Sequence, residues 1–143
     1  MIRLFIILTV FIVACSDAKT EKRSSDRDKI DSDCDKVVQL IAQGDSQKAM
    51  QHLKSISVMS PSDLDSLAIT INSQMASLLP SYGRLTGYEF VKEFSAKDIL
   101  VRRNYLLKFE RYYLRCSFTI YKTVGGWKVT NFDYDDSLIE VLY

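Results

Sequence analysis

The hydrophobic and polar positions of the 143-residue chain change their period about half-way along it. Apolar residues recur at helical spacing over three stretches between residues 33 and 79. They alternate with polar residues over four stretches between residues 84 and 134. Residues 16–81 hold no Phe, Tyr or Trp, whereas residues 82–143 hold all eight Tyr. Because aromatic residues favour strands, the pattern predicts helices first and a sheet afterwards.

Three helices are predicted before residue 82. The first runs from about 33 to 43, where Gly44 suits a left-handed cap. The second begins near residue 46, and the third begins with Pro61 at its first position and is ended by Pro80 and Gly83. The apolar positions expected in the core are Val37, Val38, Leu40, Ile41, Ala49, Met50, Leu53, Ile56, Leu64, Leu67, Ala68, Ile71, Met75, Leu78 and Leu79.

Four strands are predicted over 84–94, 99–109, 113–123 and 127–134. Short connections between them predict an antiparallel meander. The fold class is therefore α+β, with three N-terminal helices packed on a curved four-stranded sheet. Simple alternation places four side chains of the first strand on one face, namely Tyr88, Phe90, Lys92 and Phe94.

The first fifteen residues form a separate apolar segment, MIRLFIILTVFIVAC. Arg3 is its only charged residue, and residues 4–14 are apolar except for Thr9. A membrane-spanning helix needs about twenty apolar residues, so this run is too short to span a bilayer stably. Its charge, length and position are typical of a signal peptide, which the mature protein loses.

The end of this segment, Ile12-Val13-Ala14-Cys15, resembles the lipobox of bacterial lipoproteins. There a branched apolar residue precedes the cysteine by three positions and a small residue precedes it directly. The resemblance implies cleavage before Cys15 and its lipidation with diacylglycerol and palmitate. An ordinary signal peptide with a chance cysteine is the alternative. Because Ser16 and not an aspartate follows, the resemblance implies the outer membrane of a Gram-negative cell, facing the periplasm.

Residues 16–33 hold eleven charged residues of eighteen, with Ile30 as the only large apolar side chain. Such a segment buries too little apolar surface to offset its ordering entropy, so we expect a disordered tether. A solvated helix with i,i+4 ion pairs is the alternative. The expected organisation is a signal peptide at 1–14, a lipidated cysteine and tether at 15–33, and one domain at 34–143.

The charge balance excludes one class of partner. The chain has 19 Lys and Arg against 18 Asp and Glu, and removal of residues 1–14 removes only Arg3, which leaves no formal net charge. No nucleic-acid partner is expected, because nucleic-acid binding rests on clustered positive charge. One His and three Cys leave little material for a metal site, and no cofactor is expected.

The C-terminal part, residues 82–136, resembles the NTF2-like and cystatin-like group, and within it small bacterial envelope proteins. The resemblance rests on an aromatic strand, a Gly-rich hairpin with a Trp, and a closing aromatic-acidic stretch. These are Phe118-Thr119-Ile120-Tyr121-Lys122, Gly125-Gly126-Trp127-Lys128-Val129 and Asn131-Phe132-Asp133-Tyr134-Asp135-Asp136. It implies helices packed in the concavity of a bent antiparallel sheet.

Two cysteines remain once Cys15 carries lipid. Cys34 lies at the start of the first predicted helix, and Cys116 lies at a core-facing position of the third predicted strand. In an oxidising periplasm the two can form a disulfide that pins the helix to the sheet. Two buried free thiols are the alternative.

A candidate ligand face on two neighbouring strands consists of Arg103, Arg115, Tyr105, Tyr113 and Tyr121. Guanidinium groups flanked by Tyr rings bind anions or aromatic rings. The alternative is that the arginines pair with acids across strands.

Three functions follow from these observations. The first is a non-catalytic envelope lipoprotein that binds a protein partner or a small ligand, with its membrane contact supplied by the lipid anchor. The second is an NTF2-like enzyme that uses a pocket acid such as Asp98 or Asp133 with a Tyr. The third is a structural subunit of a larger envelope or secretion complex. We favour the first, and we assign no catalytic or metal-binding residue, because the sequence has no nucleophile or phosphate-loop motif.

Overall fold

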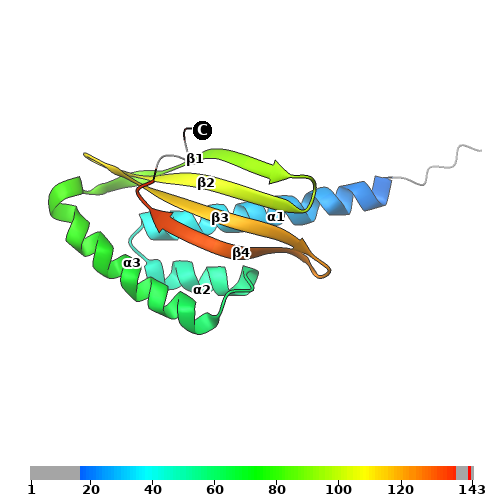
Figure 1. Ribbon diagram of the computed structural model, residues 1–143, viewed down its shortest axis with the longest axis horizontal. Coiled ribbons are helices and arrows are strands. Elements are labelled where there is room, and N and C mark those ends of the chain that lie inside the picture. Colours follow the sequence, from blue (N-terminus) through cyan, green and yellow to red (C-terminus); the bar gives the residue numbers. More distant parts are fainter. Residues whose placement is uncertain (1–16, 138–141, 143) are drawn as a thin grey trace, which may run out of the picture.

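The computed structural model describes residues 17–137 and 142, with side chains described from residue 25 onward. This part of the chain forms three helices followed by a four-stranded sheet (Figure 1). The helices are α1 (Asp17–Ala42), α2 (Ser46–Ile56) and α3 (Pro61–Tyr82), and the strands are β1 (Leu85–Ala96), β2 (Leu100–Phe109), β3 (Tyr113–Thr123) and β4 (Gly126–Asp135). The predicted α+β class is confirmed.

The strands lie in the order β1-β2-β3-β4, each antiparallel to the next, which confirms the predicted meander. The bounds of β3 are those predicted, and the ends of the other strands differ by one or two residues. The register pairs Val101 with Ile120 and Leu107 with Leu114, so the buried alternate positions of β2 and β3 face the same side. That side carries the core.

The helices build the core in succession: α1 lies along one face of the sheet, α2 packs on α1, and α3 packs on α2. Most predicted core positions are buried, and Leu79 is an exception at 46% exposed. The helical side chains of the core are Ile30, Cys34, Val37, Val38, Ile41, Ala49, Met50, Leu53, Ile56, Leu64, Ala68 and Ile71.

The helix ends follow their local sequence closely. Gly44, with φ +80°, follows the end of α1, and the Asp45 carboxylate caps α2 by accepting from the Lys48 amide at 3.0 Å. Pro80 lies inside the last turn of α3, so it does not end the helix as predicted. The helix ends at Gly83, which has φ +78° and where a Cβ would lie 2.6 Å from Glu110.

The first helix begins far earlier than predicted. Because α1 starts at Asp17, the predicted disordered tether is wrong over the part of 16–33 that the structure describes, and the helical alternative is correct there. Two i,i+4 ion pairs, Arg27–Asp31 and Lys29–Asp33, stabilise this helix.

Ile30 gives this charged segment a tertiary contact. Its side chain is only 4% exposed and belongs to the core. Composition alone undervalues such a segment, because one buried isoleucine and ion pairs to the sheet are contacts that composition does not count.

A β-bulge in β1, between Phe90 and Lys92, changes the face of the residues that follow. Phe90 pairs with Tyr105 and Glu93 pairs with Arg103, so both face the helices. The prediction that Phe94 shares the face of Phe90 is therefore wrong, because the extra residue of a bulge interrupts the two-residue alternation.

Replacement of Ile30 by alanine tests whether the charged segment belongs to the fold. We expect Ile30→Ala to lower the free energy of unfolding by about 2–4 kcal/mol, the usual effect of truncating a buried isoleucine. Ser25→Ala, at an exposed position of the same segment, is the control and should change it by less than about 0.5 kcal/mol. Urea unfolding followed by circular dichroism measures both, and equal midpoints for the two variants contradict the packing of α1 described above.

Candidate functional site

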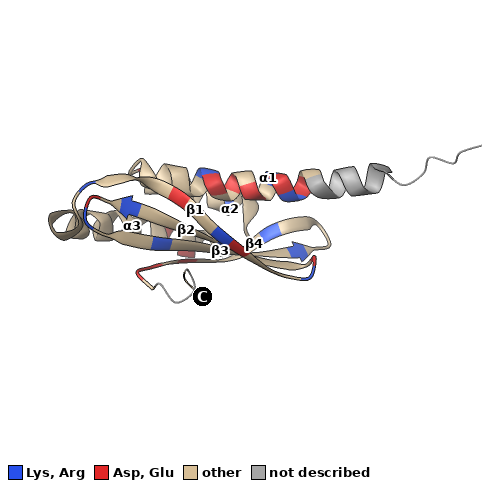
Figure 2. Ribbon diagram, turned by 90° about the horizontal axis from the view of Figure 1, so that it is seen from above, with Lys and Arg blue, Asp and Glu red and all other residues tan. Residues whose placement is uncertain are grey.

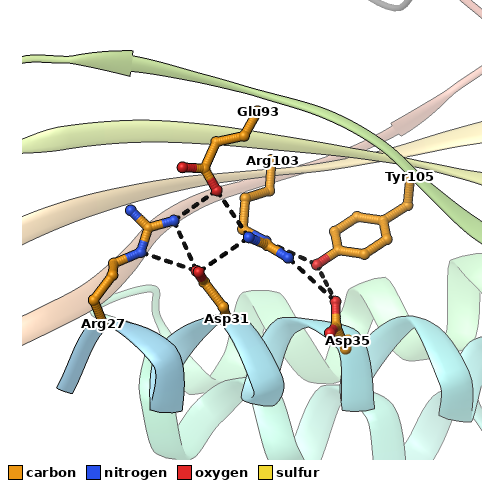
Figure 3. A network of polar contacts seen from close by, with 6 residues as sticks. All are labelled: Arg27, Asp31, Asp35, Glu93, Arg103 and Tyr105. Carbon is orange, nitrogen blue, oxygen red and sulfur yellow. Dashed lines mark hydrogen bonds and ion pairs between the residues drawn. The ribbon is translucent and has the colours of Figure 1, made fainter. Parts of the chain in front are cut away.

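A cluster of charged side chains joins α1 to the sheet at Arg103 (Figure 3). The guanidinium of Arg103 lies 2.8 Å from Glu93 of β1, and 3.1 Å and 3.5 Å from Asp31 and Asp35 of α1. Arg27 completes the cluster, at 2.8 Å from Asp31 and 2.7 Å from Glu93. The Arg103 side chain is only 10% exposed, so these contacts are made largely away from water.

Tyr105 extends the cluster toward the centre of the sheet. The Arg103 Nε donates to the Tyr105 hydroxyl at 2.9 Å, and that hydroxyl donates to Asp35 Oδ1 at 2.5 Å. Burial raises the pKa of Tyr105, so its hydroxyl stays protonated and remains a donor. Burial also raises the pKa of Asp31, against the lowering effects of Arg27 and Arg103. These groups satisfy one another, which makes the cluster a clamp between helix and sheet.

The opposite face of the sheet is not covered by any described helix (Figure 2). We call it the open face. The register assigns its residues, because cross-strand partners point to the same side. They are Glu89, Lys92, Phe94, Ala96, Leu100, Arg102, Asn104, Leu106, Lys108, Tyr113, Arg115, Ser117, Thr119, Tyr121, Lys128, Asn131, Asp133 and Asp135.

Polar side chains occupy the centre of the open face. Arg102 donates to Asp133 Oδ2 at 3.0 Å and lies 3.4 Å from the Ser117 hydroxyl. Asn131 donates to the same carboxylate oxygen at 2.9 Å. Asp133 thus holds the Arg102 guanidinium, which keeps 34% of its side-chain area exposed.

A second ion pair lies beside this group. Arg115 is only 5% exposed and binds both oxygens of Asp135, at 3.0 Å from Nε and 2.6 Å from Nη2. Its hydrogen bonds hold the pKa of the Asp135 carboxyl below its ordinary value. A bidentate pair of this kind fixes the orientation of both side chains.

Asn104 lies between these two groups on β2 and is fully buried. Neither its amide nitrogen nor its amide oxygen has a hydrogen-bond partner in the described part of the chain. Buried amides without partners are rare in folded proteins, because each costs about 1–3 kcal/mol. Asn104 is therefore an unusual buried side chain among the described residues of the open face.

An apolar hollow continues the open face toward the β1–β2 turn. It has a volume of about 260 Å³ and is lined by Phe94, Ser95, Ala96, Leu100, Arg102 and Thr119. Phe94 is 42% and Leu100 39% exposed, and Tyr121 beside Leu100 is 44% exposed. Exposed apolar side chains next to a fixed guanidinium are typical of a recognition surface.

A smaller hollow of about 190 Å³ lies between α1, the end of α2 and the β3–β4 turn. Its lining includes Asp26, Lys29, Asp33, Trp127 and Lys128, so it is more polar than the hollow on the open face.

The predicted ligand face does not form as a single surface. Arg103 and Tyr105 lie on the helix-covered face in the buried clamp, whereas Arg115 and Tyr121 lie on the open face. In an antiparallel pair directly opposed residues share a face, and Arg103 opposes the buried Phe118, whereas Arg115 lies an odd number of positions away from Phe118 and faces the other side. Both arginines pair with acids, the alternative that the sequence left open.

Tyr113, the remaining member of that predicted face, lies at the far end of β3. There its ring stacks on Tyr112, with the centroids 4.8 Å apart.

Sequence reasoning missed Arg102 and Asn104. The alternation of the sequence does contain the information. Along β3 it places Arg115, Ser117 and Thr119 on the side away from the core, and along β2 it places Arg102 and Asn104 on one side of their strand. Only the pairing register shows that these two sets face the same side.

The two cysteines of the described chain, Cys34 and Cys116, are both buried free thiols, so the predicted disulfide is not formed. Burial raises the pKa of each thiol, which keeps both sulfurs protonated and poorly nucleophilic. Tyr105, the cross-strand partner of Cys116, extends to Asp35 of α1 and fills space between sheet and helix.

Asp98, proposed as a pocket acid, lies in the exposed β1–β2 turn, and Asp133 is held by Arg102 and Asn131.

His52 lies 3.0 Å from Asp33, a contact between α2 and α1 that sequence spacing does not predict. No group of three or more His, Cys, Asp or Glu suited to a metal ion occurs among residues 25–137.

The signal peptide and the lipobox at Ile12, Val13, Ala14 and Cys15 lie outside the described residues. Within the described part, no helix combines the length and apolar character needed to cross a membrane.

Comparisons with protein-family models, with curated proteins and with solved structures find no match for this chain.

Removal of the Arg103 guanidinium tests the clamp. We expect Arg103→Met to lower the free energy of unfolding by about 3–5 kcal/mol, because it leaves acids facing one another with low exposure. Part of this loss should disappear when Glu93→Gln is added, with a coupling energy of about 1–3 kcal/mol in a double-mutant cycle.

The exposed pair Lys108–Glu89, on the same two strands, is the matched control. Its cycle, Lys108→Met with Glu89→Gln, should give a coupling energy below about 1 kcal/mol, since both side chains are near water. Urea unfolding measures both cycles. Equal coupling energies would mean that the Arg103–Glu93 pair of the clamp contributes no more than an exposed ion pair does.

Proposed function

We propose that this chain is a lipid-anchored lipoprotein of the bacterial cell envelope, which faces the periplasm and acts as a non-catalytic binding or accessory module. The anchor is supported by the sequence Ile12-Val13-Ala14-Cys15 at the end of an apolar segment too short to span a bilayer. Two or more acyl chains hold a protein stably on a membrane, whereas one does not. The outer membrane is the proposed location, since Ser16 follows the cysteine.

The single structural observation that carries the binding function is the open face. It joins a guanidinium held in place by Asp133 to an apolar hollow lined by Phe94 and Leu100. No carboxylate lies among the described residues that line this hollow, which favours recognition over the acid-and-Tyr chemistry of an NTF2-like enzyme. An envelope protein is the partner that we propose for it.

The finer fold assignment belongs to the same proposal. One sheet face carries the helices and the other stays open, the arrangement expected of an NTF2-like or cystatin-like domain. This arrangement supports binding on the open face, because such a sheet supplies a rigid platform for exposed side chains.

Lipidation at Cys15 is tested by metabolic labelling. In bacteria that express the full chain with its leader, we expect radiolabelled palmitate on the wild-type protein and its recovery in the membrane fraction. Cys15→Ala should carry no label and leave the membrane fraction. Cys34→Ala, at a buried cysteine, is the control and should keep the label. Unlabelled wild-type protein that retains its leader would refute the anchor.

The open face is tested by affinity capture from detergent-solubilised membranes. We expect the lipidated wild-type chain to retain one stoichiometric envelope protein, and Leu100→Asp to lose at least about nine-tenths of it, since a charge in the hollow opposes apolar contact. Leu79→Asp, on α3, is matched in chemistry and close in exposure (46% against 39% for Leu100) and should retain the partner. Equal retention by both variants would contradict recognition through the open face.

A further inference from the structure

The topology brings three parts of the chain to one end of the molecule. In the meander, the β1–β2 and β3–β4 turns lie at the same end of the sheet, and the N-terminal part of α1 leaves the domain at that end (Figure 1). Asp26 and Lys29 of α1 line a hollow together with Gly125 and Gly126 of the β3–β4 turn. We call residues 97–99 and 122–128 the hairpin tips.

The hairpin tips expose apolar side chains that the fold does not use. Val124 is fully exposed, at 110% of the reference area, and Ile99 is 49% exposed. Turns of this kind are usually made of Gly, Asn, Asp or Ser, and Gly125 and Gly126 already supply the freedom that this turn needs. A valine at its apex therefore contributes no packing, and residues that break a local rule without a folding gain point to function.

The charges of the tips themselves favour an anionic surface. The tips hold three lysines, Lys97, Lys122 and Lys128, against one aspartate, Asp98, and the hollow beside the β3–β4 turn adds Lys29, Asp26 and Asp33 of α1. Apolar side chains ringed by lysine are the pattern of protein segments that lie in the headgroup layer of a bilayer, because the apolar part enters and the ammonium groups meet phosphate.

The position of the proposed anchor selects the bilayer as the occupant. Only Ser16 separates Cys15 from the first residue of α1. The helix advances about 1.5 Å per residue, so Asp26, beside the β3–β4 turn, lies about 14 Å along the axis from Asp17. A lipid on Cys15 therefore holds the hairpin tips close to the membrane, within reach of the headgroups when α1 is inclined to the surface.

We propose that the hairpin tips, led by Val124 and supported by Ile99, contact the phospholipid surface in the anchored protein and set the domain's orientation on it. This inference rests on the proposed function, because it requires the lipid on Cys15. It adds a second membrane contact, made by the folded domain itself. With the tips on the membrane, the open face lies at an angle to the membrane surface, so a partner can reach it.

A tryptophan placed at the tip tests the contact. The chain has a single tryptophan, Trp127, so Trp127→Phe gives a background without one. Val124→Trp in that background puts the probe at the apex of the β3–β4 turn, and Tyr112→Trp, 40% exposed at the β2–β3 end, is the control at the opposite end of the sheet. The full lipidated chains are reconstituted into vesicles of phosphatidylcholine and phosphatidylglycerol with brominated acyl chains, which quench tryptophan emission on contact.

We expect the Val124→Trp probe to lose about half or more of its emission relative to unbrominated vesicles, and the Tyr112→Trp probe to lose less than about one-tenth, because the tip enters the acyl boundary. Adding Ile99→Asp to the tip probe should reduce this quenching at least about twofold, since a charged side chain resists entry into the acyl boundary.

Vesicle flotation of the same samples separates the two proposals. Chains that float, with a tip probe no more quenched than the control probe, would overturn the membrane contact and leave the anchor standing. Chains that do not float would overturn the anchor and the contact that depends on it. A tip probe that is quenched only after Cys15→Ser abolishes lipidation would also overturn the inference, because the anchor is what positions the tips.

Discussion

The contact of α1 with the sheet at Arg103 determines how the rest of the molecule is arranged. One guanidinium, largely withdrawn from water, meets carboxylates from two elements that are far apart in the chain, β1 and α1. Arg27 and the Tyr105 hydroxyl donate to the same oxygens that Arg103 contacts, Oε2 of Glu93 and Oδ1 of Asp35. Because an unpaired charge at low exposure is strongly unfavourable, the helix has one favourable position along the sheet. The apolar side chains of α1, such as Ile30, Val37 and Ile41, then pack at that position.

This constraint has consequences on the other side of the sheet. With all described helices on one face, the polar centre around Arg102 and Asp133 lies on the opposite face without a helix over it. Asn104 lies on the same face, and its buried amide has no hydrogen-bond partner within the described chain. Folding uses one face of the sheet, and the recognition that we propose uses the other.

The two surfaces that we propose for binding are compatible in space. The open face lies along the sheet, whereas the hairpin tips lie at one end of it, beside the path of α1 toward Cys15. A domain held by its lipid and by Val124 would present Leu100 and Arg102 sideways to the periplasm. The arrangement needs no flexible tether, because α1 continues as a helix through the charged segment as far as Asp17.

The sequence by itself determined the class of fold, the meander, the helix caps and most of the core, because periodicity, capping and turn chemistry act between near neighbours in the chain. Only the tertiary structure decided that residues 17–33 are helical, since that depends on Ile30 and Arg27 meeting the rest of the protein. Only the tertiary structure separated Arg103 from Arg115, because the face of a side chain depends on strand register. The bulge in β1, which turns Glu93 toward Arg103, was also decided by the tertiary structure. A bulge arises from the pairing of two strands, so the alternation within one strand does not predict it.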